Sequence, residues 1–447
     1  MDFLNPLFGS EAMGTIFSDS AFLQYMLDFE AALAKAEAQC GIIPAAAAEA
    51  ISASCKIRLI NVSALADATV LALNPAIPLV KQLTDLVKQS NPDAARFVHW
   101  GATSQDVNDT ALILQIRGAF AILEKDLDSL RKSLAALAQK YRSTPIAGRT
   151  LMQQAMPTTL GVKVAGWLDG LNRHRERLNQ TRQRTLVLQF GGAVGTMAAL
   201  RGKGLAVAEA LAQALSLRLP DAPWHTQRDR VAEVATTLGL LTGSLGKMAR
   251  DISFHMQTEV SELYEPAGNG RGGSSTMPHK RNPVSAAVIL AAATRVPGLV
   301  STMLNAMPQE DERGLGNWHA EWETLPEIFR LTAGALHHLA TIAPQLEIDE
   351  QHMRRNLDVT HGMIFAEAVT MALAAQIGKS AAHSILEDAS KQARSSGQHL
   401  RDVLAGNSAV KDRLTTTELD ELFNPKNYLG SAEELVDRVI ATARKSD

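Results

Sequence analysis

One segment of the chain combines glycine, hydroxyl and cationic residues at close spacing. Residues 265–283 read EPAGNGRGGSSTMPHKRNP, with four glycines between positions 268 and 273, then Ser274 and Ser275, then Lys280 and Asn282. Glycines at this density let backbone N–H groups approach an anion closely. A long loop of this kind is usually either functional or disordered. Its lysine and asparagine favour a site for a negatively charged group.

Two other segments place hydroxyl and amide side chains beside glycine. Residues 101–106 read GATSQD and contain Thr103 and Ser104, and residues 148–153 read GRTLMQ and end at Gln153. Thr103 and Ser104 taken alone are also consistent with a helix cap. We therefore keep both interpretations of this pair, a cap and a contact to a substrate carboxylate.

Several basic residues and histidines near these segments have two open interpretations. An arginine can hold an anionic substrate or can form a buried ion pair, and neither is excluded for Arg149, Arg228 or Arg230. Arg271 and Arg313 are further candidates for contact with an anionic substrate. Isolated histidines are more often structural than catalytic, and this is the expectation for His225, His279 and His319.

Long helices with continuous apolar seams are predicted to position these segments. Apolar residues recur every three or four positions from Ile113 to Tyr141, from Leu160 to Leu178 and from Val231 to Ile252. This spacing is typical of helices that pack at about 20° in a bundle. Residues 18–40 predict a further amphipathic helix, capped by Ser18 or Asp19.

The expected fold class is all-α, with three helical domains and a long central helix bundle. We place the N-terminal helical domain at residues 1–111, the central long-helix bundle with the glycine-rich loop at 112–360, and the C-terminal helical domain at 361–447. An aromatic content of only 5% among abundant apolar residues favours packed helices over a β-sandwich.

Composition excludes several classes of partner. The formal net charge of −3 from 44 basic and 47 acidic residues does not indicate a nucleic-acid-binding protein. Two cysteines form neither a disulfide framework nor a zinc site, so no metal and no cofactor is expected. The most apolar stretch, Val284 to Leu299, contains Arg295 and Pro297 and is expected to be too short for a membrane span. A cytoplasmic protein is expected.

The glycine-rich loop resembles the signature loop of the fumarase/aspartase superfamily. Residues 273–283, GSSTMPHKRNP, match the pattern G-S-S-x-M-P-x-K-x-N-P, and residues 101–106 and 148–161 resemble the first and second regions of that superfamily. The similarity runs in the same order over nearly the whole chain. Members remove or add a proton beside a carboxylate through an aci-carboxylate intermediate.

The resemblance implies roles for individual residues. Ser274 would be the general base or acid, and Lys280 would stabilise its alkoxide. The substrate would be bound by hydroxyl, amide and backbone groups and by arginines, at Thr103, Ser104, Gln153, Ser275, Met277, Asn282, Arg149, Arg228 and Arg313. It also implies a homotetramer in which three subunits contribute to each active site.

One departure from the superfamily pattern narrows the function. Many members have a histidine directly after the threonine of the second region, where it acts on the leaving group, but this chain has Leu151. Together with residues 74–79 (NPAIPL), 223–230 (PWHTQRDR) and 318–326 (WHAEWETLP), this resembles the branch of bacterial 3-carboxy-cis,cis-muconate lactonizing enzymes. That branch implies a cycloisomerase of aromatic catabolism in the β-ketoadipate pathway, which forms 4-carboxymuconolactone from a small tricarboxylate.

Two alternatives remain open from the sequence. One is an adenylosuccinate lyase-like or other fumarate-releasing lyase of the same superfamily. The other is a non-catalytic structural relative, against which the presence of Ser274, Lys280 and Asn282 argues.

Overall fold

The computed structural model describes residues 3–268, 270–273 and 276–445, and helices dominate these residues. Strands form only two short antiparallel pairs within them: β1 (Pro145–Thr150) with β2 (Gln153–Thr159), and β3 (Leu263–Tyr264) with β4 (Glu347–Ile348). The all-α prediction is confirmed. Neither strand pair was predicted. The sequences of β1 (PIAGRT) and β2 (QQAMPTT) do not alternate between apolar and polar residues, and β3 and β4 have only two residues each.

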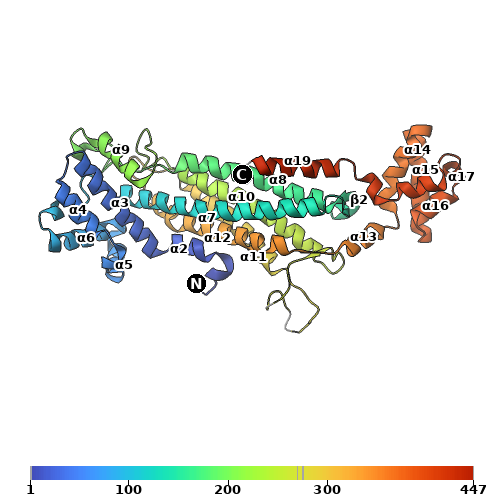
Figure 1. The fold of residues 1–447 in the computed structure, drawn as a ribbon, viewed down its shortest axis with the longest axis horizontal. Helices are drawn as coiled ribbons and strands as arrows, with labels where there is room; N and C mark the ends of the chain where they lie inside the picture. Colours follow the sequence, from blue (N-terminus) through green and yellow to red (C-terminus); the bar gives the residue numbers. More distant parts are fainter. Residues whose placement is uncertain (1–2, 269, 274–275, 446–447) are drawn as a thin grey trace. The chain divides into compact units, whose positions relative to one another are not determined.

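The helices fall into three groups along the chain (Figure 1). The shorter N-terminal and intervening helices are α1 (Asn5–Phe8), α2 (Glu11–Ile16), α3 (Asp19–Gln39), α4 (Ala45–Ser54), α5 (Val62–Ala72), α6 (Ala76–Ser90) and α9 (Gly204–Leu215). The long helices are α7 (Ser104–Lys140), α8 (Leu160–Thr185), α10 (Asp229–His255), α11 (Val284–Asn305) and α12 (Asn317–Ile342). The C-terminal helices are α13 (Glu350–Asp358), α14 (Ala366–Ile377), α15 (Lys379–Ser396), α16 (Leu400–Gly406), α17 (Ser408–Lys411), α18 (Thr416–Leu422) and α19 (Ala432–Lys445).

The chain forms two compact units, each built from several segments. Unit 1 contains Met1–Asp126, His174–Gly243 and Ala291–His337, and unit 2 contains Leu127–Arg173, Ser244–Leu290 and His338–Asp447. Each long helix contributes residues to both units. These units do not follow the expected boundaries near 111 and 360, since α7 and α12 cross the unit borders elsewhere. The division into three domains stays a prediction.

In unit 1, the predicted seams form the core of a helix bundle. Ile113, Phe120 and Leu123 on α7 are fully buried, as are Val234 and Leu238 on α10. Hydroxyl pairs and an ion pair link the helices of this unit: Thr181 of α8 to Thr237 of α10 at 3.0 Å, Thr242 of α10 to Thr332 of α12 at 2.8 Å, and Arg295 of α11 to Glu327 of α12. The bundle prediction is confirmed for these helices.

The smaller helices of unit 1 pack around α3. The side chain of Ser18 accepts a hydrogen bond from the Ala21 N–H at 3.2 Å, so Ser18, one of the two predicted caps, starts α3. Figure 1 shows α4 and α6 in blue in the same group as α3. The face of α3 that packs there buries two glutamates, Glu30 and Glu37.

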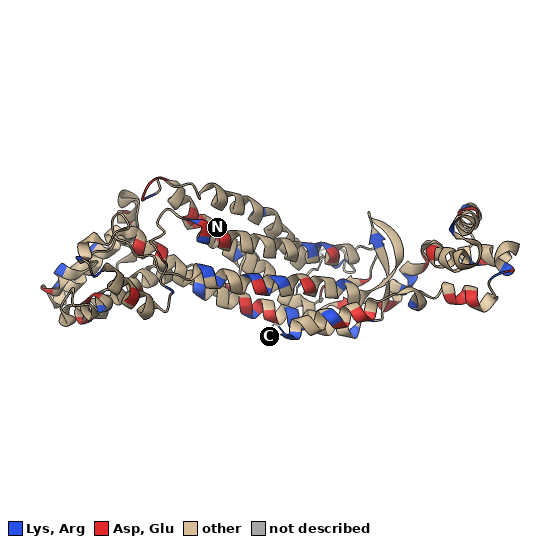
Figure 2. Cartoon of the chain, turned by 90° about the horizontal axis from the view of Figure 1, so that it is seen from above, with Lys and Arg blue, Asp and Glu red and all other residues tan. Residues whose placement is uncertain are grey.

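Unit 2 contains the hairpin of β1 and β2 and the C-terminal helices. Helices α14 to α17 gather into one compact group (Figure 1), with Val369, Leu373 and Leu400 in its core. On the long helices of this unit, Trp167 Nε1 donates to Asp251 at 2.8 Å, which joins α8 to α10. Figure 2 shows basic and acidic residues interspersed along the helices.

Helix α11 corrects one expectation from the sequence. It has 22 residues, so its length and composition alone meet the requirement for a membrane span, although Arg295 and Pro297 lie within it. Among the described residues it is the one single helix that does so; α13 and the segment after it, Met363–Ile377, pass the same test only when a pair bent by 79° is counted as one span. About a third of the most apolar part of α11 is buried in this chain, including Ala286, Ile289 and Val296.

Candidate active site

The first region lies where α7 begins, in unit 1. Asp106, in the first turn, accepts a hydrogen bond from the Thr103 N–H at 3.0 Å, so its carboxylate caps the helix. Thr103 and Ser104 are half-buried, and their hydroxyl groups bond to no residue that the structure describes. The cap is thus supplied by Asp106, and the two hydroxyls keep their hydrogen-bonding capacity.

Asp106 also fixes the turn that faces the start of α7. Its carboxylate accepts the N–H groups of Gly191 at 3.0 Å and Gly192 at 2.9 Å, and it contacts His225 Nε2 at 2.7 Å. A Cβ on Gly191 would lie 2.9 Å from the His225 ring, so only glycine permits this close approach. His225 is buried and has the structural environment that the sequence favoured.

One turn further along α7, a buried ion-pair network holds the bundle together. Arg228 lies between Asp109, with contacts of 2.8 and 3.1 Å, and Glu321, with contacts of 3.0 and 2.5 Å. Trp318 Nε1 donates to Asp109 at 3.1 Å. The guanidinium donors of Arg228 are therefore engaged by carboxylates, which favours the ion-pair interpretation. A contact of Arg228 with substrate stays a prediction.

Arg313 has a different environment in the same unit. Its Nη2 donates to the Ala193 carbonyl at 2.8 Å, and its buried Nη1 has no hydrogen-bond partner among the described residues. A buried donor without a partner is costly and usually has a functional explanation. Of the predicted arginines in unit 1, Arg313 is therefore the stronger candidate for an anion contact.

The second region is the hairpin of β1 and β2, in unit 2. Arg149 on β1 forms a bidentate ion pair with the buried Glu262, with contacts of 2.9 and 2.8 Å. Gln153 lies opposite Thr150 in the hairpin and is exposed. The ion-pair interpretation of Arg149 thus agrees with the structure, and a contact with substrate remains a prediction.

The tip of this hairpin is strained and apolar. Leu151 and Met152 have φ angles of 48° and 66°, in the left-handed region that favours Gly and Asn. Their side chains are 97% and 72% exposed in this chain. Strained backbone of this kind is common at functional sites. Leu151, the residue that replaces the expected histidine, therefore lies in the turn between β1 and β2 with its side chain almost fully exposed.

Glu262 connects the hairpin to the base of the signature loop. His255 donates to it at 2.6 Å and Asn356 at 2.8 Å, in addition to Arg149. Burial acts to raise the pKa of Glu262, but these hydrogen bonds outweigh it and lower the pKa to about 2. Burial also lowers the pKa of His255, which favours the neutral imidazole that donates to the carboxylate.

A cationic cavity of about 570 Å³ lies beside the hairpin in unit 2. Its lining includes Arg149 and Thr150 from the hairpin, Lys163 from α8 and Lys247 from α10. Burial lowers the pKa of Lys163, which makes its amine easier to deprotonate than an exposed lysine. Arg149 and Lys247 form ion pairs with Glu262 and Asp251, so much of the positive charge of this cavity is neutralised by the protein itself.

The third region is the signature loop, whose two ends are anchored firmly. Glu265 accepts the N–H groups of Ser285 at 3.0 Å and Ala286 at 2.8 Å and so caps α11. Arg281 bonds to Glu347 at 2.8 Å and lies over the Tyr264 ring at 4.7 Å. Arg271, another predicted candidate, donates to the Ser285 hydroxyl at 2.6 Å.

Between these anchors, Lys280 and Met277 are exposed to solvent and Asn282 is half-buried. Lys280 is exposed, and its N–H donates to the Met277 carbonyl at 3.0 Å. The Asn282 N–H donates to the Gly272 carbonyl at 2.8 Å, which requires glycine because φ there is 68°. Lys280 and Asn282 line a cavity of about 280 Å³. Ser274 and Ser275 lie outside the described residues.

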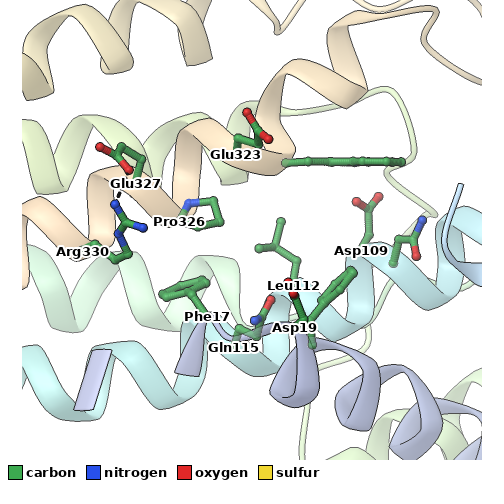
Figure 3. Close-up of a pocket in the computed structure, with 12 residues that line it drawn as sticks. Phe17, Asp19, Asp109, Leu112, Gln115, Glu323, Pro326, Glu327 and Arg330 are labelled. Carbon is green, nitrogen blue, oxygen red and sulfur yellow. Dashed lines mark hydrogen bonds and ion pairs between the residues drawn. The ribbon is translucent and has the colours of Figure 1, made fainter. Parts of the chain in front are cut away.

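A separate cavity of about 390 Å³ in unit 1 does not suit an anionic substrate. Figure 3 shows Asp19, Glu323 and Glu327 around it, with Glu327 paired to Arg330. Aromatic and apolar residues, among them Phe17 and Leu112, also line this cavity (Figure 3). Carboxylates on several sides would repel a tricarboxylate.

The sequence did not identify the carboxylates that organise these regions. Asp109, Glu262 and Glu321 are buried, and their arginine partners lie between 93 and 119 residues away in the sequence. Asp106 and Glu321 stood inside recognised segments, but neither was predicted as a site residue. No cluster of three or more His, Cys, Asp or Glu residues suited to a metal ion occurs among the residues that the structure describes.

Comparison with known proteins agrees with this arrangement. Residues 9–298 match the family described as Lyase, and residues 362–439 match the family described as Adenylosuccinate lyase C-terminus. The chain is 55% identical to the 3-carboxy-cis,cis-muconate cycloisomerase of Pseudomonas aeruginosa, over 97% of this chain and 95% of the relative.

Solved structures give the same result. The 3-carboxy-cis,cis-muconate lactonizing enzyme from Pseudomonas putida superposes with a TM-score of 0.96 at 51% identity, covering 100% of both chains. The β-carboxy-cis,cis-muconate cycloisomerase from Acinetobacter calcoaceticus gives 0.94 at 46% identity, covering 98% of this chain and 99% of the other. The chain belongs to the lyase family of the fumarase/aspartase superfamily, in its cycloisomerase branch.

Proposed function

We propose that Lys280, Asn282, Thr103 and Ser104 bind and activate a tricarboxylate for intramolecular lactonization. The activity is that of a 3-carboxy-cis,cis-muconate cycloisomerase, supported by relatives with this name that match the chain over nearly its full length. The observation that carries the residue assignments is the exposed Lys280 beside Asn282 in an anchored, glycine-rich loop.

The reaction has two chemical events. One carboxylate oxygen of the substrate attacks a carbon of its own double bond, and the π electrons move onto the carboxylate conjugated with that bond, which gives an aci-carboxylate. The carbon beside this carboxylate then takes up one proton, which gives 4-carboxymuconolactone. One C–O bond forms, no electrons are lost, and the reaction as written needs no redox group.

Most of the acceleration comes from stabilising the aci-carboxylate. Fixed cations and donors aimed at developing negative charge typically contribute factors of about 10²–10³ each. We assign this role to Lys280 and Asn282, with the Met277 N–H. Ser274, which lies outside the described residues, is the proposed proton donor. Thr103, Ser104, Gln153 and Ser275 are proposed to hold the other carboxylates.

Leu151 is compatible with lactonization and not with the expulsion of an amine. A lyase that releases an amine gains from an acid near the leaving group. The leaving group of the reverse lactonization is a carboxylate, which is stable as an anion and needs no acid. An apolar residue at the tip of the hairpin therefore removes nothing that the cycloisomerase reaction uses.

We also propose a homotetramer with active sites shared among three subunits. In one chain, the hairpin and the signature loop line different cavities of unit 2, and no described residue lines both. The strained Leu151–Met152 tip and the largely unburied α11 are apolar surfaces suited to burial by another subunit. The proposed setting is the cytoplasm, in the protocatechuate branch of aromatic catabolism.

An ultraviolet assay tests the activity directly. Loss of the conjugated diene of 3-carboxy-cis,cis-muconate should follow first-order kinetics in enzyme, and Ser274→Ala should abolish it. Rapid release of fumarate from adenylosuccinate would instead favour the rival lyase, to which the match over residues 362–439 points.

Subunit mixing tests the shared site. Lys280→Ala and a Thr103→Val, Ser104→Ala double variant should each be inactive, and co-refolding them should restore part of the activity. A fully active monomer in sedimentation would contradict the tetramer.

A further inference from the structure

A buried carboxylate outside the recognised motifs is paired with the segment that leads into the first region. Glu30 on α3 is 1% exposed, and its Oε1 is 2.6 Å from Nδ1 of His99. Its other oxygen, Oε2, has no hydrogen-bond partner among the residues described. His99 is four residues before Thr103, so this ion pair connects α3 to the proposed substrate-binding turn.

The backbone of His99 is strained in a way that its side chain explains. Its φ angle is 57°, and Gly101, two residues later, has a φ of 73°. A left-handed conformation costs a residue other than glycine about 1–2 kcal/mol. Glycine would adopt this conformation without strain, so the presence of histidine indicates that its side chain has a role here. The tether to Glu30 holds the ring in this conformation.

The imidazole has one free edge. Nδ1 is occupied by Glu30, and Nε2 on the opposite edge of the ring bonds to no described residue, while 19% of the side chain is exposed. Burial acts to lower the pKa of His99, but the charge of Glu30, its hydrogen bond and the charge of Asp106 outweigh it, so the pKa is raised. The ring therefore binds a proton more readily than an ordinary imidazole, and its Nε2 edge has no partner among the described residues.

A second buried glutamate on α3, Glu37, adds no charge to this cluster near pH 7. Glu37 lies two turns along the same face of α3, and neither of its carboxyl oxygens has a partner within the described part of the chain. Burial, and then the charge of Glu30, raise its pKa to about 9. Glu37 is therefore neutral near pH 7, and the carboxyl group of α3 that pairs with His99 is that of Glu30.

We propose that Glu30 is a positioning residue that holds His99 as an imidazolium, with its Nε2–H available to one carboxylate of the substrate beside Thr103 and Ser104. A cation that the protein has already desolvated and oriented binds an anion with less reorganisation than a flexible surface lysine. This inference rests on the proposed function, because it needs a substrate with several carboxylates.

The pH profile of Glu30→Gln tests the proposal. The glutamine keeps a hydrogen bond to Nδ1 but removes the charge, so burial lowers the pKa of His99 and the ring becomes neutral near pH 7.5. We expect KM for 3-carboxy-cis,cis-muconate to rise about tenfold at pH 7.5 with kcat nearly unchanged, and to recover toward the wild-type value near pH 5.5. A structural defect would lower activity at every pH.

Glu37→Gln is the matched control. It has the same helix face, the same burial and the same substitution, but it replaces a neutral carboxyl with a neutral amide. Its KM should follow that of the wild-type protein across the pH range. If Glu30→Gln does not fold, His99→Asn carries the test, with an approximately tenfold higher KM that no longer depends on the protonation of residue 99.

Calorimetry with propane-1,2,3-tricarboxylate separates this proposal from the activity itself. In buffers of different ionisation enthalpy at pH 7.5, binding should take up about one more proton in Glu30→Gln than in the wild-type protein. Equal proton uptake, or a Glu30→Gln profile like that of the wild type, overturns the role of Glu30. A wild-type protein that binds this ligand but leaves carboxymuconate unchanged overturns the proposed function instead.

Discussion

The start of α7 and the signature loop differ in whether the cation beside them is paired and buried or exposed. At the start of α7, Arg228 lies buried between Asp109 and Glu321. In the loop, Lys280 is exposed, although Arg281 beside it is anchored to Glu347. Arg228, which directly precedes α10, and Lys280 were both predicted site residues, yet only Lys280 is exposed.

This difference separates residues that position the site from residues that act in it. A buried cation that is ion-paired cannot bind a ligand without leaving its carboxylate partner unpaired. An exposed lysine in an anchored loop only has to exchange its hydrating water for a substrate carboxylate. The four experiments below test this distinction, in decreasing order of expected effect.

Lys280→Ala should have the largest effect, and it should lower kcat/KM without changing stability. We expect kcat/KM for carboxymuconate to fall about 10³-fold, which corresponds to about 4 kcal/mol of lost transition-state stabilisation. The free energy of unfolding should change by less than about 0.5 kcal/mol, because the side chain is exposed. His279→Ala, one residue away and also exposed, should remain within a few-fold of wild type. Similar losses in both variants would contradict a specific role for Lys280.

Arg228→Met should affect stability first. It leaves Asp109 and Glu321 buried without their cation, and breaking a pair of this kind costs about 3–5 kcal/mol. Urea unfolding measures this loss, with Arg230→Met as the control two residues away. The triple variant with Asp109→Leu and Glu321→Met should recover part of the stability. A stable Arg228→Met protein that has only lost substrate affinity would show that Arg228 contacts substrate after all.

Glu262→Gln tests the carboxylate that joins the hairpin to the loop. The folded pKa of about 2 lies below the ordinary value of 4.5, so ionised Glu262 stabilises the fold above pH 4.5, and this contribution is lost as the pH falls toward 2. We expect the variant to be on the order of 3 kcal/mol less stable at pH 7, with a flatter dependence on pH between 4.5 and 2. Glu347→Gln, at an exposed ion pair, should cost less than about 1 kcal/mol.

Glu37→Gln should give the smallest change, and it should be a gain. The folded pKa of about 9 lies above 4.5, so the unfolded chain ionises first and stability falls as the pH rises from 4.5 to 9. The amide removes this loss, which is about 3 kcal/mol at pH 7. Burying amide N–H donors without partners costs about 1 kcal/mol, so unfolding at pH 7 should cost about 2 kcal/mol more than in wild type. Parallel stability–pH curves for the two proteins would show that Glu37 ionises normally.

Local patterns in the sequence were sufficient for the helices and for the three polar regions. The seams on α7, α8 and α10 repeat at the helical period, and Ser18 is a standard cap, so both could be read from neighbouring residues. The loop from Gly268 to Pro283 was recognisable because glycine, lysine and asparagine stand together. The strained Leu151–Met152 tip was not, since nothing local predicts a left-handed leucine.

The sequence by itself determined the fold class and the cations of the loop, because these depend on short-range spacing and on residue type, and its resemblance to the lactonizing enzymes indicated the cycloisomerase branch. Tertiary structure decided which charges are available. Arg149 and Arg228 are bound by Glu262, Asp109 and Glu321, carboxylates more than ninety residues away from them. Glu30 and His99 meet across 69 positions. Whether a charge is paired depends on burial and on such distant partners, so it becomes visible only when the chain is folded.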